Sequence, residues 1–199
     1  MTDYLSVIYG DNKPFTNYPY KLVRYLMDRY SLKGNILDLG CGRGEFLEGF
    51  KKCGLEGYGL NFEGECKLLY SNNSFDTVFS KSVLEHLYYP EKIVKEIYRI
   101  LKPGGLCITM VPDWESIYKT YFEDYTHRTP FMASSLRDIF LIHGFKDVKV
   151  EKFRQLPFLW KHPYLNPLCS LISLLYRTGM TNKLIKFSKE KMLLGTGRK

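Results

Sequence analysis

The chain of 199 residues lacks the patterns of several protein classes. Its five cysteines are an odd number with no CxxC pair and no metal-ligand spacing, so we expect reduced thiols and no bound metal. No apolar run approaches the roughly 20 residues of a membrane-spanning helix. The opening Met-Thr-Asp-Tyr-Leu also lacks the basic and then apolar order of a secretory signal. Together these absences favour a cytoplasmic protein.

Acidic residues are scarce in the C-terminal quarter. Residues 151–199 hold ten Lys or Arg and two Asp or Glu, which accounts for the whole net charge of +8. Residues 1–150 hold 19 of each sign. A neutral body with a basic end suggests a polyanionic partner, either a membrane surface or a nucleic acid, although a solvated basic face explains the charge equally well.

Short apolar runs alternate with segments of helical period, a pattern typical of a parallel α/β sheet. It predicts helices at residues 18–30, 45–52, 91–101 and 136–143, and strands at 35–39, 57–60, 77–80, 106–111, 148–153 and 192–197. We interpret the chain as one domain: an N-terminal helix or lid (1–34), a core (35–155), an apolar and basic insertion (156–188) and a final strand (189–199).

The most informative segment is residues 36–44, Ile-Leu-Asp-Leu-Gly-Cys-Gly-Arg-Gly, where an expected strand ends in a glycine turn that opens a helix. Glycines suit a turn whose backbone takes positive φ or lies against a ligand. Ligands of open α/β sheets bind at this carboxyl edge. The dinucleotide fingerprint GxGxxG would need glycine at position 45, which is Glu45. The spacing therefore argues against that fingerprint.

With three later segments, this turn resembles the motifs of the class I S-adenosylmethionine-dependent methyltransferases. The segments are Ser-Phe-Asp-Thr-Val-Phe at 74–79, Val-Leu-Glu-His-Leu at 83–87 and Arg-Ile-Leu-Lys-Pro-Gly-Gly at 99–105. The resemblance covers residues 35–111 and extends in weaker form almost to the C-terminus. It implies a Rossmann-like α/β fold with a mostly parallel sheet, an antiparallel last strand and helices on both faces, and it implies S-adenosylmethionine as the cofactor.

The resemblance also implies where the cofactor contacts the chain. The methionine part is expected at Asp38, Gly40, Cys41, Gly42 and Gly44. Ser80 and Lys81 are expected to line the cofactor at the end of the next strand. Asn61 stands where the family usually has an acid for the ribose hydroxyls, and Glu65 resembles the acid that meets the adenine amino group.

The chain departs from the family after residue 61. The family places a helix and a third strand there, but here Asn61 is followed within a few residues by Gly64 and Glu65. A parallel crossover needs a dozen or more residues. Either strands two and three form an antiparallel hairpin, or strand three is lost, or residues are missing from the chain at this point. Each alternative thins one wall of the adenosine pocket and motivates a second hypothesis, a non-catalytic protein with a binding or membrane role.

The expected reaction is methyl transfer to a hydroxyl or carboxyl of a small molecule, a glycan or a lipid-linked acceptor. His127, in Asp-Tyr-Thr-His-Arg-Thr-Pro-Phe at 124–131, resembles the substrate-facing loop of small-molecule and glycan methyltransferases. It is our first candidate for an acid or base, because histidine titrates near neutrality, and His86 is the second. Each histidine also has a purely structural interpretation. His127 would then only hold its loop by a hydrogen bond, and His86 would only take part in the start of a helix.

Nucleic acid is a less favoured acceptor. Residues 80–83 are Ser-Lys-Ser-Val, not the Asn/Asp-Pro-Pro-Tyr/Phe motif of base amino methylation, so RNA methylation rests on the basic tail alone. The insertion combines many leucines with lysines, as an interfacial membrane element does. Peripheral membrane contact through 156–191 is therefore one interpretation. Packing of this segment on the sheet, or a homodimer interface, is the other.

Overall fold

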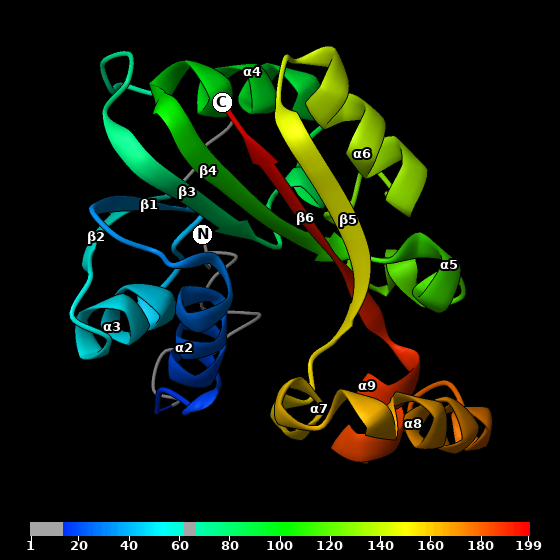
Figure 1. Cartoon of the computed structure of the whole chain (residues 1–199). Coiled ribbons are helices and arrows are strands. Elements are labelled where there is room, and N and C mark those ends of the chain that lie inside the picture. The colour runs from blue at the N-terminus through cyan, green and yellow to red at the C-terminus, as the bar shows by residue number, and fades with distance from the viewer. Residues whose placement is uncertain (1–13, 62–66) are drawn as a thin grey trace.

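The computed structural model describes residues 14–61 and 67–199 and shows a six-stranded sheet in the order β2-β1-β3-β4-β6-β5 (Figure 1). The strands are β1 (Asn35–Leu39), β2 (Glu56–Leu60), β3 (Phe75–Lys81), β4 (Leu101–Pro112), β5 (Lys146–Arg154) and β6 (Lys191–Arg198). Strand β6 runs antiparallel to β4 and β5, whereas β1, β2, β3 and β4 pair in parallel. The predicted α/β fold with an antiparallel last strand is confirmed.

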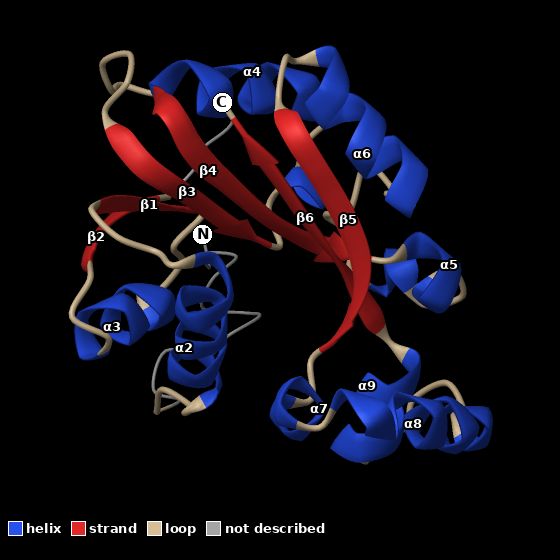
Figure 2. Cartoon of the chain, viewed as in Figure 1, coloured by secondary structure: helices blue, strands red, loops and turns tan. Residues whose placement is uncertain are grey.

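Helices cover both faces of the sheet (Figure 2). The main helices are α2 (Tyr18–Tyr30), α3 (Glu45–Lys52), α4 (Pro90–Ile100) and α6 (Ala133–Ile142), and short pieces are α5 (Trp114–Ile117), η1 (Leu84–His86) and η2 (Tyr121–Glu123). Successive strand residues point to opposite faces. Ile36 packs in the core cluster that contains residues of α2 and α3, and Leu37 packs with residues of α4 and α6. The alternation of β1 therefore builds two cores at once.

Strand β2 lies at the edge of the sheet and, among the described residues, pairs with β1 alone. Residues 61 and 67–74, the described part of the connection to β3, form no strand. The described residues of this connection therefore show neither a hairpin with β2 nor an additional strand between β2 and β3. Glu65 lies outside the described residues, so its predicted adenine contact stays a prediction.

The connection into β3 is held by α4. The Arg99 guanidinium donates to the backbone carbonyls of Leu68 (2.9 Å) and Tyr70 (2.8 Å), and Glu96 accepts from the Leu68 amide at 2.9 Å. Arg99 and Glu96 also pair with each other at 2.7 Å. These side chains satisfy backbone groups that a neighbouring strand would otherwise pair with.

The segment between β5 and β6 forms a small helical lobe, α7 (Pro157–Lys161), η3 (Pro163–Leu165), α8 (Asn166–Ile172), η4 (Ser173–Leu175) and α9 (Lys183–Lys189). Leu156, Leu159 and Cys169 form its core. The lobe lies beyond the end of β5 and the start of β6 (Figure 1). None of the described helices is long and apolar enough to cross a membrane.

The predicted element ranges agree with the structure to within a few residues except at the start of β4. We expected Pro103-Gly104-Gly105 to end a helix before a strand at residue 106, but β4 begins at Leu101, directly after α4. The pairing of β3 with β4 shifts register between Phe75 and Thr77. The strand thus absorbs the glycine turn as an irregularity, and the amide of Gly104, whose φ is +76°, donates to the carbonyl of Lys199 at 2.9 Å.

Candidate functional site

The glycine turn joins β1 to α3 at the carboxyl edge of the sheet. Gly40, Gly42 and Gly44 all have positive φ (78°, 54° and 84°), a conformation that favours glycine. Their surroundings differ. A Cβ on Gly40 would lie 2.3 Å from the Val83 side chain, whereas a Cβ on Gly42 would meet nothing within 4 Å. Gly40 is required by packing, and Gly42 leaves open space where a side chain would otherwise project.

A cleft opens beside this turn and is lined by Asp38, Gly42 and Lys81 together with Tyr18, Pro19 and Phe46 from α2 and α3. Although Asp38 lines the cleft, it is almost completely buried, with only 2% of the residue exposed. Its Oδ2 atom has no hydrogen-bond partner in the described part of the chain. Burial raises the pKa of Asp38 to about 7. A carboxylate in this state favours a cationic ligand, which would supply the missing partner.

Asn61, at the end of β2, bonds to the turn itself. Its Oδ1 accepts from the Gly42 amide at 2.7 Å, and its Nδ2 donates to the Gly42 carbonyl at 3.1 Å. Cys41 Sγ lies 3.4 Å from the same Oδ1 atom. The side chain thus fixes the glycine turn with both of its amide atoms. The predicted ribose contact of Asn61 stays a prediction, and the clamp on Gly42 is a role that the sequence did not indicate.

The two candidate residues at the end of β3, Ser80 and Lys81, lie in different surroundings. Lys81 lines the cleft, and burial lowers the pKa of its ammonium while nearby Glu85 raises it. Ser80 is 1% exposed and bonds to Thr109 Oγ1 on β4 at 3.1 Å. Ser80 is not among the residues that line the cleft, so its predicted cofactor contact stays a prediction. Ser82, which follows, does line it.

Beyond Lys81, the two candidate histidines lie together. Glu85, His86 and His127 each offer one potential ligand atom, and these atoms lie within 4.8 Å of one another. The His86 and His127 ring centroids are 4.9 Å apart. Burial raises the pKa of Glu85 to about 8, and burial with the neighbouring His127 lowers the pKa of His86. The structure therefore brings together segments 83–87 and 124–131, whose histidines are 41 positions apart in the sequence.

Backbone hydrogen bonds fix this junction. The amides of Arg128 and Thr129 both donate to the Glu85 carbonyl, at 2.7 and 3.0 Å, and Thr129 Oγ1 donates to the Leu87 carbonyl at 2.6 Å. The His127 ring is oriented as well. Its Nδ1 lies 2.6 Å from the Tyr121 carbonyl, which can only accept, so Nδ1 carries the proton. In the neutral ring Nε2 then holds the lone pair, 4.0 Å from the Asp124 carboxylate.

Six residues that line the cleft were not among the predicted site residues: Tyr18, Pro19, Arg43, Glu45, Phe46 and Ser82. Tyr18 lines the cleft and lies edge-on to Trp160 of the lobe, with ring centroids 5.9 Å apart, and the lid role expected of residues 1–34 stays a prediction. No local motif could have identified this contact, since 142 residues separate the two rings in sequence.

The chain is similar to known methyltransferases. The model of a methyltransferase domain family matches residues 15–150. Phosphoethanolamine N-methyltransferase 2 of Caenorhabditis elegans is 34% identical over 86 residues, 41% of this chain and 20% of that protein. Ubiquinone biosynthesis O-methyltransferase of Nitrosococcus oceani is 27% identical over 121 residues, 48% of this chain and 51% of that protein. The chain thus spans about half of one relative and a fifth of the other.

Among solved structures, a methyltransferase from Archaeoglobus fulgidus described as SAM-dependent is similar over 90% of this chain and 94% of that one. The TM-score is 0.63 and the sequence identity is 21%, so this similarity concerns the fold alone. The family match covers most of the sheet and the glycine turn. The chain therefore belongs to the methyltransferase-domain family, and its fold is that of the class I methyltransferases that use S-adenosylmethionine as methyl donor.

Proposed function

We propose that the protein transfers a methyl group from S-adenosylmethionine to a hydroxyl or carboxyl oxygen of a small molecule, a glycan or a lipid-linked acceptor. The observation that carries this proposal is the junction of Glu85, His86 and His127 next to Lys81 of the cleft. The names of the two relatives give nitrogen and oxygen acceptors respectively. The junction favours a hydroxyl, because a hydroxyl must lose a proton on methylation and the imidazoles of His86 and His127 lie here to accept it.

The cleft residues fit the methionine part of S-adenosylmethionine. This cofactor carries two positive charges, on its ammonium and its sulfonium, and supplies an electrophilic methyl group. Asp38 offers a buried carboxylate with an unpartnered oxygen, and Gly42 leaves space where a side chain would project. The Asn61 clamp holds the Gly42 backbone in place for this contact. These residues bind and orient the donor, which is the main contribution a protein makes to methyl transfer.

His127 is the proposed general base. Its Nδ1 proton is held by the Tyr121 carbonyl, so the lone pair of Nε2 can take the proton of the acceptor. The Asp124 carboxylate, 4.0 Å from Nε2, stabilises the imidazolium that results. This arrangement repeats a common pattern in which a third group orients the base. The backbone bonds from the His127 loop hold it on Glu85, whose charge acts on Lys81 of the cleft.

The test begins with isothermal titration of S-adenosylmethionine and S-adenosylhomocysteine into the protein. Methyl transfer is then measured by release of S-adenosylhomocysteine over a panel of hydroxyl and carboxyl acceptors. His127→Gln should reduce turnover about 100-fold or more while leaving S-adenosylmethionine affinity unchanged. His143→Gln is the matched control, because His143 caps α6 and its Nδ1 bonds to the Ile139 carbonyl. Dialysis against a chelator should not change turnover.

Three results would contradict the proposal. Folded protein that binds neither ligand would support the non-catalytic hypothesis. Transfer that needs an added divalent cation would give Glu85, His86 and His127 a ligand role in place of proton transfer. Methylation confined to RNA, with binding that weakens steeply with salt, would favour the nucleic-acid alternative.

A further inference from the structure

The helical lobe exposes an apolar stripe that the methyltransferase site does not use. Tyr164, Leu168, Leu171 and Leu175 recur at intervals of four, three and four residues through η3, α8 and η4, and Leu174 extends the stripe. These five side chains are between 53% and 78% exposed. Residues at this spacing share one face of a helix. A row of exposed leucines of this kind marks a contact surface.

The stripe is not needed to fold the lobe. Leu159 and Cys169 lie in the lobe's own core, against Leu165 and Phe187. Arg154 fixes the lobe to β5 by bonds to Asn166 Oδ1 (2.8 Å), Ser170 Oγ (2.9 Å) and the Ser188 carbonyl (3.0 Å). The inner side of α8 is thus buried and bonded, and its outer side presents leucines in a fixed orientation.

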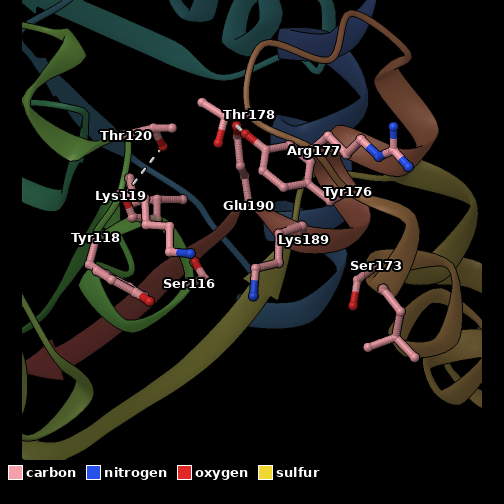
Figure 3. Close-up of a pocket in the computed structure, with 12 residues that line it drawn as sticks. Ser116, Tyr118, Lys119, Thr120, Ser173, Tyr176, Arg177, Thr178, Lys189 and Glu190 are labelled. Atoms are coloured by element: carbon pink, nitrogen blue, oxygen red, sulfur yellow. Dashed lines mark hydrogen bonds between the residues drawn. The ribbon is translucent and has the colours of Figure 1, made fainter.

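Positive charge borders the stripe. A groove of about 370 Å³ lies between the α5 loop and the lobe (Figure 3). Lys119 lines it on the side of the α5 loop, and Arg177 and Lys189 line it on the side of the lobe. Leu174 belongs to both the stripe and the groove wall. Among the described residues that line the groove, Glu190 is the one acid, and it accepts from the Tyr176 hydroxyl at 3.0 Å and pairs with Lys186 at 3.8 Å. The groove is therefore cationic and continuous with an apolar surface.

The lobe also lies at the same edge of the sheet as the cofactor cleft. Strand β5 is antiparallel to β6, which is antiparallel to β4, so β5 ends at the edge where β1 and β3 end. The contact between Trp160 and Tyr18 joins the lobe to the cleft wall. A surface that docks through the lobe would therefore lie near the site of methyl transfer.

We propose that the stripe formed by Tyr164, Leu168, Leu171, Leu174 and Leu175 docks the protein onto an anionic membrane surface. The leucines enter the boundary between headgroups and acyl chains, and the groove with Lys119, Arg177 and Lys189 takes a lipid phosphate. Apolar insertion together with attraction to anionic lipid is the combination that interfacial binding requires. The net charge of +8 in residues 151–199 adds to this attraction. If the proposed methyl transfer holds, the acceptor is drawn from the membrane surface.

Vesicle flotation tests the docking. Wild-type protein should float with vesicles of phosphatidylcholine and phosphatidylglycerol and should bind far less to phosphatidylcholine alone. Leu171→Ser with Leu175→Ser should weaken binding at least about tenfold. The matched control is Leu141→Ser with Ile142→Ser, two apolar residues of α6 that are 44% and 78% exposed and lie outside the stripe.

Charge is tested separately. Arg177→Glu should reduce the preference for phosphatidylglycerol, whereas Lys95→Glu, an exposed lysine of α4, should not. Each variant is also titrated with S-adenosylmethionine, and unchanged affinity shows that failure to dock is independent of the cofactor site. Equal flotation of the stripe and control variants would overturn the proposal. So would a wild-type dimer in sedimentation equilibrium that the stripe variant converts to a monomer, because a second copy would then cover the leucines.

Discussion

Asp38 is a buried acid whose protonation state affects the stability of the protein without its cofactor. Its pKa is raised from 3.8 to about 7 by burial, so the folded chain holds a proton that the unfolded chain releases. The free energy of unfolding should therefore fall as the pH rises from about 4 to about 7 and then level off. The pKa of Glu85 is raised to about 8, so this residue adds a further fall in the free energy of unfolding that continues to about pH 8.

Asp38→Asn should remove part of this pH dependence. We expect the variant to be more stable than the wild type by on the order of 1–3 kcal/mol at about pH 8, with a smaller difference at about pH 5. Thermal unfolding of the ligand-free protein across this range measures the effect. Asp138→Asn, on the exposed side of α6, is the control and should follow the wild type. A parallel loss of stability with pH in Asp38→Asn and wild type would argue against this assignment.

Gly42→Ala separates ligand contact from backbone strain. The new methyl group would project into open space at the cleft, where the methionine part of the cofactor is placed. Titration calorimetry should show S-adenosylmethionine affinity reduced at least about tenfold.

Gly54→Ala is the matched control for that change. Gly54 also has positive φ (+73°) and open surroundings, but it follows α3 and lies outside the cleft. Both variants carry a similar strain of roughly 1–2 kcal/mol. Equal affinities in the two variants would show that the Gly42 backbone does not contact the cofactor.

Helix α4 serves two purposes, since one face packs on the sheet and Arg99 holds the connection into β3. Arg99→Ala would leave the carbonyls of Leu68 and Tyr70 without these donors and would remove the cation that pairs with Glu96. We expect the free energy of unfolding to fall by about 1–3 kcal/mol in urea titration. Arg24→Ala removes an exposed pair with Asp28 on α2 and should cost less than about 0.5 kcal/mol. Similar losses in the two variants would mean that the connection contributes little to stability.

Features that depend on neighbouring residues could be predicted from the sequence, whereas contacts between distant segments could not. Strand β1 and helix α3 were predicted to the residue, because apolar period and glycines act locally. The side-chain direction of Ser80 and the Asn61 clamp on Gly42 were not, because they depend on strand register and on a turn 19 residues away. The pairing of His86 with His127 arises from a loop bonded to η1, which no spacing rule encodes. The sequence motifs thus identified residues of the site but not their partners.

The cofactor cleft and the lobe meet at Tyr18, which lines the cleft, bonds to Gln155 Oε1 at 3.1 Å and contacts Trp160. Trp160 in turn stacks on Phe153 at the end of β5. The other tryptophan of the chain, Trp114, lies instead beside Tyr121, whose carbonyl holds the His127 ring. One indole therefore reports on the cofactor side of the molecule and the other on the side proposed for the acceptor.

This division makes a prediction for intrinsic fluorescence. S-Adenosylmethionine should change the emission of wild type and of Trp114→Phe, since the ligand contacts the cleft wall that Tyr18 shares with Trp160. The change should disappear in Trp160→Phe, while calorimetry should show that this variant still binds the cofactor. If Trp160→Phe kept the full emission change and Trp114→Phe lost it, the cofactor would act on the His127 loop. The lobe would then be uncoupled from the cleft, and docking at a membrane could not influence methyl transfer through Tyr18.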